Sequence, residues 1–284
     1  MIRIIFNPKA ARGIGAEKFK KFLNRLQAEK ILYANYKTER KGHGKSLARE
    51  LSKTKEPIIV AGGDGSIYDV INGMDMNIPI SIIPLGTGND VAKTLGIKFN
   101  IEKNIEALKK QPKLIDYATI NEKYRSLSFI SYGIATDMVR AMASFANNNK
   151  ANYFFAMVNM LFSFNAKTYE LEFNGEKKIV TADFLSIHNC IYAGGGMYLG
   201  HNASVTDGFL DLLIVEYKGK FRRIMNAISI LRKNLHNQPN ASMYRISNMK
   251  IVSKNDKYCC VDGEIIQETA INIKVVPGGL KILY

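Results

Sequence analysis

The stretch Pro57–Asp69, P-I-I-V-A-G-G-D-G-S-I-Y-D, decides how this chain folds. Its apolar part, Ile58–Ala61, is short, mostly β-branched and followed by glycine, which predicts a buried strand. Apolar residues recur with helical spacing from Ile67 onward. The stretch therefore predicts a strand, a glycine-rich turn over Gly62–Ser66 and then a helix.

The predicted turn has the properties of a phosphate-binding loop. Backbone N–H groups at the start of a helix bind phosphate, and glycine allows both positive φ angles and close approach. Asp64 would repel a phosphate unless it holds Mg²⁺ or takes a proton from a hydroxyl. Asp64 therefore indicates phosphoryl transfer, and the alternative is a tight turn with a helix-capping side chain.

The composition is that of a basic globular protein. The chain has 284 residues, of which 46% are hydrophobic and 23% are charged. Lys and Arg number 40 against 25 Asp and Glu, so the net charge is +15. This excess suits nucleotide phosphates or an anionic lipid surface. Nucleic acid is not expected because no recognition-helix or base-stacking pattern is found, and solubility alone is the other reading of the charge.

Cysteine usage and hydropathy predict a cytoplasmic protein. Cys190, Cys259 and Cys260 form no C-x-x-C pair and are expected to be reduced thiols of the core. The N-terminus lacks the pattern of a secretory leader. The most apolar long segment, Tyr153–Phe164, has twelve residues, which is too short to cross a bilayer. Any membrane contact is therefore expected to be peripheral.

Strands and helices alternate through the first hundred residues. Each predicted strand ends in a loop rich in glycine or polar residues, which is typical of an open α/β sheet that binds ligands at the carboxyl ends of its strands. The predicted strands are Met1–Phe6, Ile31–Thr38, Ile58–Ala61 and Ile80–Ile83.

Strands dominate from about Asp116, interrupted by helical patterns over 135–161 and 221–235. This rhythm is typical of an antiparallel sandwich or barrel. We therefore expect a Rossmann-like open α/β nucleotide-binding domain over 1–117 and an antiparallel β-sandwich domain over 118–276. The tail 277–284 is expected to pack back on the first domain.

A second glycine loop, Pro84–Asp90, follows the fourth strand with the sequence P-L-G-T-G-N-D. The Thr87 hydroxyl can donate to a phosphate, and Asn89 and Asp90 can cap the next helix. Because parallel strands end at one edge of a sheet, we expect this loop to lie beside Gly62–Ser66.

These segments together resemble the diacylglycerol kinase catalytic family, especially its bacterial lipid kinases, with sphingosine and ceramide kinases as more distant members. The resemblance rests on N-P-x-x-A at Asn7, G-G-D-G-S at Gly62 and P-L-G-T-G-N-D at Pro84. It continues through S-Y-G-I-A-T-D-M-V at Ser131, N-A-S-V-T-D-G-F-L at Asn202 and V-D-G-E at Val261. It implies an ATP- and Mg²⁺-dependent lipid kinase of phospholipid biosynthesis, with diacylglycerol as the expected substrate and phosphatidic acid as the product.

The resemblance also implies site residues. In the D-G-E segment it favours Asp262 as the general base, supported by Glu264, while Asp64 stays a candidate because sphingosine kinases use the G-G-D-G aspartate. Asp137 matches a position near the lipid headgroup. Ser204, Asp207 and Phe209 match a structural Mg²⁺ site. The positions that match the ATP site are Asn7, Pro8, Lys9, Ala10, Ala11, Thr38, Gly63, Asp64, Gly65, Ser66, Ile67, Tyr68, Asp69 and Thr87.

Some features leave alternatives open. Both D-G segments also suit plain hairpin turns. The first loop reads N-P-K-A-A-R-G where the family has N-P-x-S-G, so Lys9 or Arg12 could supply charge in place of a phosphate-binding glycine. One apolar set could line an acyl-chain pocket or pack in the core: Met138, Met142, Phe145, Phe154, Phe155, Met157, Met160, Leu161 and Phe162.

Two other functions remain open at this point. One is a soluble kinase with the same G-G-D-G loop that phosphorylates NAD or a sugar phosphate. The other is a non-catalytic nucleotide or lipid sensor. An edge strand of either sheet could also pair two subunits into a homodimer.

Overall fold

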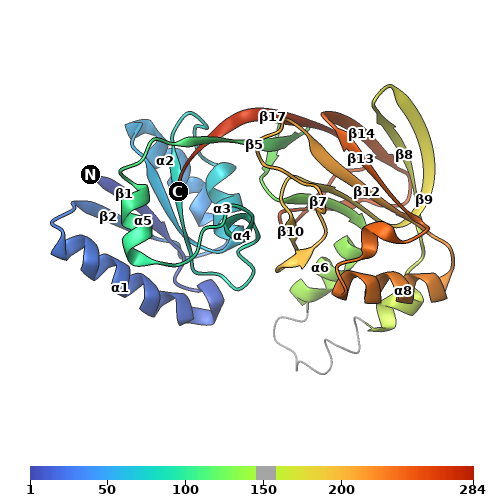
Figure 1. Cartoon of the computed structure of the whole chain (residues 1–284), viewed down its shortest axis with the longest axis horizontal. Coiled ribbons are helices and arrows are strands. Elements are labelled where there is room, and N and C mark those ends of the chain that lie inside the picture. Colours follow the sequence, from blue (N-terminus) through green and yellow to red (C-terminus); the bar gives the residue numbers. More distant parts are fainter. Residues whose placement is uncertain (145–157) are drawn as a thin grey trace.

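The computed structural model describes residues 1–144 and 158–284. Its first half is a parallel sheet with the strand order β2-β1-β3-β4 (Figure 1). The strands are β1 (Ile2–Phe6), β2 (Tyr33–Lys37), β3 (Ile58–Gly62) and β4 (Ile80–Pro84). The helices are α1 (Ile14–Ala28), α2 (His43–Leu51), α3 (Asp64–Ile71), α4 (Asp90–Thr94) and α5 (Ile101–Ala107), with 3₁₀ turns η1 (Ala10–Gly13) and η2 (Ser52–Thr54).

Helices cover both faces of this sheet because neighbouring residues of a strand point to opposite sides. Ile4 and Phe6 of β1 pack in one cluster with Phe19 and Phe22 of α1. Ile5, between them, packs in the cluster that holds residues of α2 and α3. Strands buried on both faces read as continuous apolar runs, which is why the sequence reveals them.

Helix α3 begins earlier than the sequence predicts. The prediction of a helix from Ile67 is wrong, because α3 begins at Asp64 with Gly63 as its N-cap. Asp64, Gly65 and Ser66 therefore form the first helical turn. Because these three residues are not apolar, a search for apolar residues at helical spacing does not detect this first turn.

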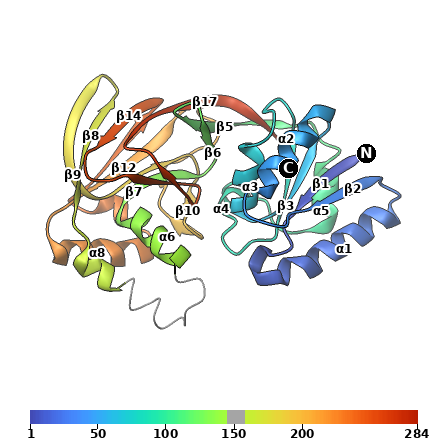
Figure 2. The same ribbon diagram turned by 180° about the vertical axis from the view of Figure 1, so that it is seen from behind.

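The second half is an antiparallel β structure with two main helices (Figures 1 and 2). Its strands are β5 (Lys113–Ile120), β6 (Tyr124–Ser126), β7 (Phe129–Gly133), β8 (Lys167–Phe173), β9 (Glu176–His188), β10 (Tyr192–Ala193), β11 (Met197–Tyr198), β12 (Leu210–Glu216), β13 (Ala241–Ile246), β14 (Asn248–Ser253), β15 (Tyr258–Val261), β16 (Glu264–Gln267) and β17 (Ala270–Leu283). Its helices are α6 (Ile134–Ser144) and α8 (Lys220–Leu231), with a 3₁₀ turn η3 (Leu235–Asn237), and residues 158–163 are also helical. The expected α/β architecture followed by an antiparallel β sandwich is confirmed.

Two predicted elements differ in extent. The strand predicted over Ser126–Ser131 is two strands, β6 and β7, because the backbone at 127–128 leaves the ladder and donates to the Asp262 carboxylate. The helix predicted over 221–235 ends at Leu231, and Lys233 follows with a positive φ of 56°. All three cysteines are free and buried, as expected.

Strand β17 joins the two halves into one sheet (Figure 1). It pairs antiparallel with β14 and β5, and its end pairs parallel with β4, where Ile282 lies opposite Ile80. The Ser81 hydroxyl adds a hydrogen bond of 3.1 Å to the Leu283 carbonyl. The register shifts between Val276 and Leu280. The domain boundary at 117/118 stays a prediction, because β5 runs through it.

Candidate active site

A pocket of about 440 Å³ opens at the carboxyl ends of the parallel strands. Its wall carries three basic side chains, Lys9, Arg40 and Lys41, and three acidic ones, Glu39, Asp69 and Glu264. This mixture suits an anionic ligand that is bound together with a cation. The lining comprises Ile5, Asn7, Lys9, Ala10, Ala11, Thr38, Glu39, Arg40, Lys41, Gly44, Gly63, Gly65, Ser66, Asp69, Gly86 and Glu264. Nine of these residues are among the positions that the sequence matches to an ATP site, and Glu264 comes from the β domain.

The remaining ATP-site predictions lie elsewhere. Ile67 is a core residue, 2% exposed. Tyr68 packs against the hydrophobic cluster of the β domain, and Thr87 is exposed. Pro8 and Asp64 are partly exposed but are not part of the pocket wall as the structure describes it.

The two glycine loops touch, as the sequence predicts. A Cβ atom on Gly63 would lie 3.1 Å from the Cα of Gly86, so a side chain here would push the loops apart. Asn89, at a φ of 51°, holds the second loop: its Oδ1 accepts from the Gly86 N–H at 2.9 Å and its Nδ2 donates to the Gly86 carbonyl at 2.7 Å. The glycines thus allow a close approach that any Cβ would prevent.

Asn7 links the first loop to the glycine turn. Its Nδ2 donates to the Ser66 hydroxyl at 3.3 Å, and its Oδ1 accepts from the Lys9 N–H at 3.0 Å. Ala11 and Arg12 both have positive φ angles, 47° and 58°. The loop therefore adopts, with non-glycine residues, a backbone conformation that glycine more often supplies.

Asp64 lies on the β-domain side of the loops. Its Oδ1 accepts from the Val91 N–H at 3.3 Å, and a Cβ on Gly88 would lie 2.9 Å from its Oδ2. Burial raises the pKa of Asp64 from its ordinary 3.8 to about 6, and the neighbouring Asp90 carboxylate adds to the rise. A carboxylate with a pKa near neutrality suits proton transfer or ligation of a cation.

At pH 8 we expect the free energy of unfolding of Asp64→Asn to be about 1–3 kcal/mol higher than that of the parent protein. The folded state raises the pKa of Asp64, so ionisation of this carboxyl opposes folding, and asparagine cannot ionise. In the parent, the protonated Asp64 carboxyl contributes its full stability below pH about 4, and this contribution is lost as the pH rises through about 6. The difference between variant and parent should therefore be small at pH 4 and large at pH 8. Urea unfolding of both proteins from pH 4 to pH 8 measures it. A difference in unfolding free energy between the two proteins that stays constant over this pH range would contradict the raised pKa of Asp64.

Asp262 is buried, 7% exposed, and its carboxylate is fully engaged. Its Oδ1 accepts from the Ser126 hydroxyl at 2.6 Å and from the Ser128 and Phe129 N–H groups at 3.0 and 2.9 Å, while Oδ2 accepts from the Leu127 N–H at 2.8 Å. Burial raises the pKa of Asp262, and these hydrogen bonds oppose that rise. Asp262 and Gly263, at φ 49° and 91°, also form the two-residue turn between β15 and β16.

Glu264 is the D-G-E carboxylate that reaches the pocket. It forms an ion pair of 2.6 Å with Lys41, whose side chain is 83% exposed. Asp69 lies in the same wall, where burial raises its pKa and the Glu264 charge adds to the rise. Among the predicted catalytic residues, Glu264 thus faces the pocket, whereas Asp64 and Asp262 interact with each other but are not part of the described pocket wall.

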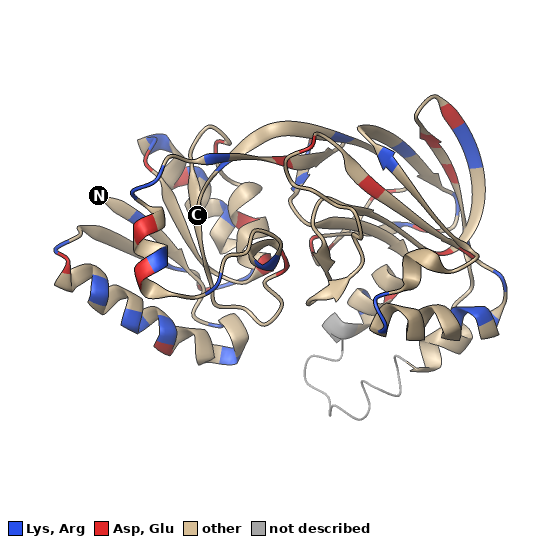
Figure 3. Ribbon diagram, viewed as in Figure 1, with Lys and Arg blue, Asp and Glu red and all other residues tan. Residues whose placement is uncertain are grey.

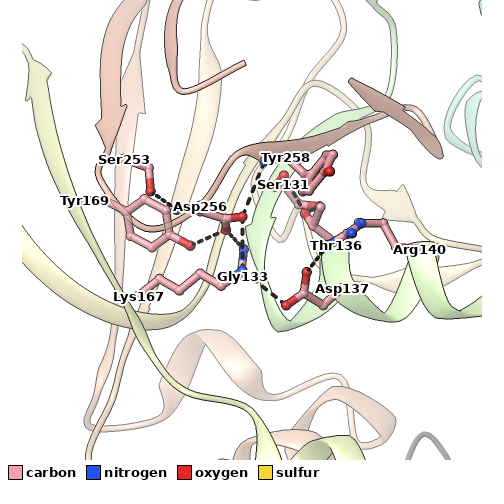
Figure 4. Close-up of polar contacts among 10 residues, drawn as sticks. All are labelled: Ser131, Gly133, Thr136, Asp137, Arg140, Lys167, Tyr169, Ser253, Asp256 and Tyr258. Atoms are coloured by element: carbon pink, nitrogen blue, oxygen red, sulfur yellow. Dashed lines mark hydrogen bonds and ion pairs between the residues drawn. The ribbon is translucent and has the colours of Figure 1, made fainter. Parts of the chain in front are cut away.

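Asp137 belongs to an ion network at the start of α6 (Figure 4). Lys167, 16% exposed, bridges Asp137 at 3.1 Å and the buried Asp256 at 3.0 Å. Asp256 also accepts from the Tyr169 hydroxyl at 3.0 Å, and Arg140 donates to Asp137 at 3.3 Å. The predicted headgroup residue therefore carries two cationic partners within the protein.

The predicted structural Mg²⁺ residues form an intramolecular pair. The Asp207 Oδ1 accepts from the Phe209 N–H at 3.0 Å, and its Oδ2 lies 2.5 Å from the Arg245 guanidinium. The Ser204 hydroxyl accepts from the Thr206 N–H at 3.4 Å. Both carboxylate oxygens thus have partners within the protein, and the Mg²⁺ site at Ser204, Asp207 and Phe209 stays a prediction.

Sequence reasoning missed two contributors to the site. Arg40 and Lys41 come from the loop after β2 and Gly44 from the first turn of α2, and the basic run T-E-R-K-G-H-G-K over these residues was a usable signal. The second contributor is Gly194–Gly196, where all three residues have positive φ and the Gly195 N–H donates to Asp90 Oδ2 at 2.9 Å. This contact ties the β domain to α4, and the run of three glycines was its signal.

Comparison with known proteins gives the family. Residues 1–120 match the diacylglycerol kinase catalytic domain, and residues 128–284 match the YegS C-terminal NAD kinase beta sandwich-like domain. The chain is 25% identical over 248 residues, 84% of its length and 79% of the relative, to a protein of Chromohalobacter salexigens named "Probable lipid kinase YegS-like".

Solved structures share the fold over the whole chain. A crystal structure described as a diacylglycerol kinase from Bacillus anthracis has a TM-score of 0.79 at 24% identity and covers 100% of this chain and 96% of that one. An NAD kinase from Archaeoglobus fulgidus, in complex with ATP, has a TM-score of 0.56 at 12% identity, with coverage of 100% and 94%. The chain belongs to the family in which a diacylglycerol kinase catalytic domain is followed by a YegS-type β-sandwich domain.

Proposed function

We propose that the protein transfers the γ-phosphoryl group of ATP to the hydroxyl of a lipid, with diacylglycerol as the first candidate. One observation carries the proposal: two glycine loops meet at the strand ends beside a pocket that holds both basic and acidic side chains, and one of these, the β-domain carboxylate of Glu264, faces that pocket. This arrangement supports a phosphate cradle in one domain with a proton acceptor supplied by the other. Family membership supports the kinase chemistry.

We assign proton abstraction to Glu264. The sequence favours Asp262, but its two oxygens already accept four hydrogen bonds, so it could take up a proton only where one of these bonds is lost. Glu264, by contrast, is paired with Lys41, whose side chain is 83% exposed. It would take the proton of the lipid hydroxyl as that oxygen attacks the γ-phosphorus, while the bond from the γ-phosphorus to the β–γ bridging oxygen breaks and ADP leaves. Lys9, Arg40 and the loop N–H groups would stabilise the phosphate charge.

The carboxylates beside the pocket suit Mg²⁺. Asp64 and Asp69 supply hard oxygen ligands, and both have raised pKa values, mainly through burial, so a bound cation would stabilise their ionised forms. Among the described residues, no group of three or more His, Cys, Asp or Glu could hold a metal alone. We therefore expect these aspartates to share Mg²⁺ with the phosphates, where it would neutralise charge on the transferred group.

A second pocket, of about 320 Å³, suits an acyl chain. It lies in the β domain between α6, α8 and the sheet, and Met138, Leu161 and Phe184 form part of its apolar wall. The Asn226 side-chain amide is buried there, and its nitrogen and oxygen find no hydrogen-bond partner within the described chain. A polar group of a bound lipid would satisfy it. Of the sequence-predicted acyl set, Met142, Phe145, Phe154, Phe155 and Met157 lie outside the described side chains.

The function is tested by transfer of labelled phosphate from Mg-ATP to an organic-extractable product. Mixed micelles would each carry one lipid: diacylglycerol, phosphatidylglycerol, an isoprenoid alcohol or a sphingoid base. We expect label in diacylglycerol. NAD is included as a soluble acceptor, because the NAD kinase fold is shared. Label in NAD and in no lipid would overturn the proposal.

A further inference from the structure

Helix α8 presents its apolar side to solvent. Phe221 and Leu231 are 77% and 82% exposed, and Ile228 is 37% exposed. Phe221 and Ile228 are seven residues apart, two helical turns, so they lie on the same face. The buried residues of this helix are instead Arg223, Asn226 and Ser229. A surface helix normally has the opposite arrangement, with its apolar stripe inward.

The buried polar side fixes this orientation. Arg223 donates to Asp183 Oδ1 through Nη2 at 2.7 Å and Nε at 2.9 Å, with both side chains nearly inaccessible to solvent. Its Nη1 also donates to the Leu161 carbonyl at 2.9 Å. Rotating the helix to bury Phe221 would break these bonds and leave Asp183 buried without a partner. The exposed apolar face is therefore held outward by the fold.

Basic side chains flank the apolar face at both ends of α8 (Figure 3). Lys218, Lys220 and Arg222 lie at its start, and Arg232 and Lys233 follow its end. Glu216, paired with Lys218 at 3.1 Å, is the acidic residue of this stretch. An apolar stripe with cationic ends matches a helix that lies in the interface of an anionic bilayer.

The acyl-chain pocket reaches the same face. Leu231 and Met197 form part of its wall, and Met197 is itself 41% exposed. Phe162, next to the carbonyl that Arg223 binds, is 47% exposed. The views from both sides place α8 and α6 along one side of the β domain (Figures 1 and 2). A lipid leaving a bilayer at this face would meet the pocket directly.

We propose that the outer face of α8 docks on an anionic lipid bilayer, inserting Phe221, Ile228 and Leu231 between headgroups. The choice of a bilayer over a protein partner rests on the proposed lipid kinase function, because a lipid acceptor must be reached at its surface. The flanking lysines and arginines bind the acidic headgroups. Docking therefore weakens as salt screens these charges.

Tryptophan fluorescence tests the docking, because the chain contains no tryptophan. Phe221→Trp places the probe on α8, and Leu32→Trp is its control, since both side chains are 77% exposed and Leu32 lies in the α/β domain. With phosphatidylglycerol vesicles we expect the emission of the α8 probe to move to shorter wavelength, and that of the control to stay. Equal responses of the two probes, or none, would overturn the proposal.

A second measurement separates docking from catalysis. Phe221→Ser with Ile228→Ser is expected to weaken vesicle binding about tenfold or more, because two apolar side chains no longer insert. Neither residue lines either pocket, so phosphorylation of a dispersed short-chain diacylglycerol should be unchanged. Normal docking with no lipid phosphorylation would refute the kinase alone. A probe shift that follows protein concentration without vesicles would show that α8 pairs two copies instead, which overturns the docking proposal.

Discussion

Glu264→Gln is expected to lower the turnover number for lipid phosphorylation by about a hundred- to ten-thousandfold, the usual contribution of a general base. Glutamine keeps the size of the side chain and loses its basicity. Because we expect Asn7, Lys9 and the glycine loops to bind the phosphates, nucleotide affinity should change little. Initial rates and nucleotide binding by calorimetry, measured on the same samples, check both statements.

Glu268→Gln is the matched control. Glu268 follows β16, pairs with Lys123 at 3.4 Å and does not line the nucleotide pocket. Its loss should leave the turnover within about twofold of the parent, as for a surface ion pair. If Glu264→Gln behaved like this control while Asp262→Asn or Asp64→Asn abolished turnover, the base would have to be reassigned to that aspartate.

Arg223→Met is expected to destabilise the protein by about 3–5 kcal/mol, the usual result of removing one partner from a buried ion pair. Asp183 would remain in the interior, where burial already raises its pKa against the opposing effect of Arg223. Without Arg223 the folded-state pKa rises further. The loss should therefore be small below pH about 4, where the carboxyl is protonated in both states, and grow as the pH rises.

A companion variant distinguishes an ion-pair effect from lost packing. Asp183→Asn combined with Arg223→Met removes both charges, and it should recover much of the stability that Arg223→Met loses. Urea unfolding of the two single variants and the double variant at pH 7 gives the coupling. Strictly additive losses would mean that the pair contributes through packing of the Arg223 stem alone.

The sequence predicted the site best where the local structure requires one particular residue type, such as glycine at a close contact between two loops. Gly63 and Gly86 could be placed together in advance, because parallel strands end at a common edge and glycine permits the contact. Asn7, Thr38 and Ser66 could be placed at one pocket because they match the ATP-site positions of the family that the sequence resembles. The order of the motifs along the chain indicated the family, and the family in turn predicted an α/β domain followed by a β-sandwich domain.

Other features depend on contacts between segments that are distant in sequence. Asp262 and Glu264 are two residues apart, but which of them faces the pocket depends on the backbone at 126–129. The periodicity of α8 shows an apolar face but not its direction, which Arg223 decides by pairing with Asp183 on β9. The pairing of Asp207 with Arg245 could likewise not be predicted from the sequence, because the two residues are 38 positions apart and meet only in the folded protein.

The pairing of β17 with β4 also has a consequence during synthesis. Ser81 and Leu283 are separated by 202 residues, so one edge of the parallel sheet stays open while the ribosome makes almost all of the β domain. Such distant pairing slows folding, and an open edge invites association with other nascent chains. We expect the first domain to need chaperone protection in the cell until its last strand arrives.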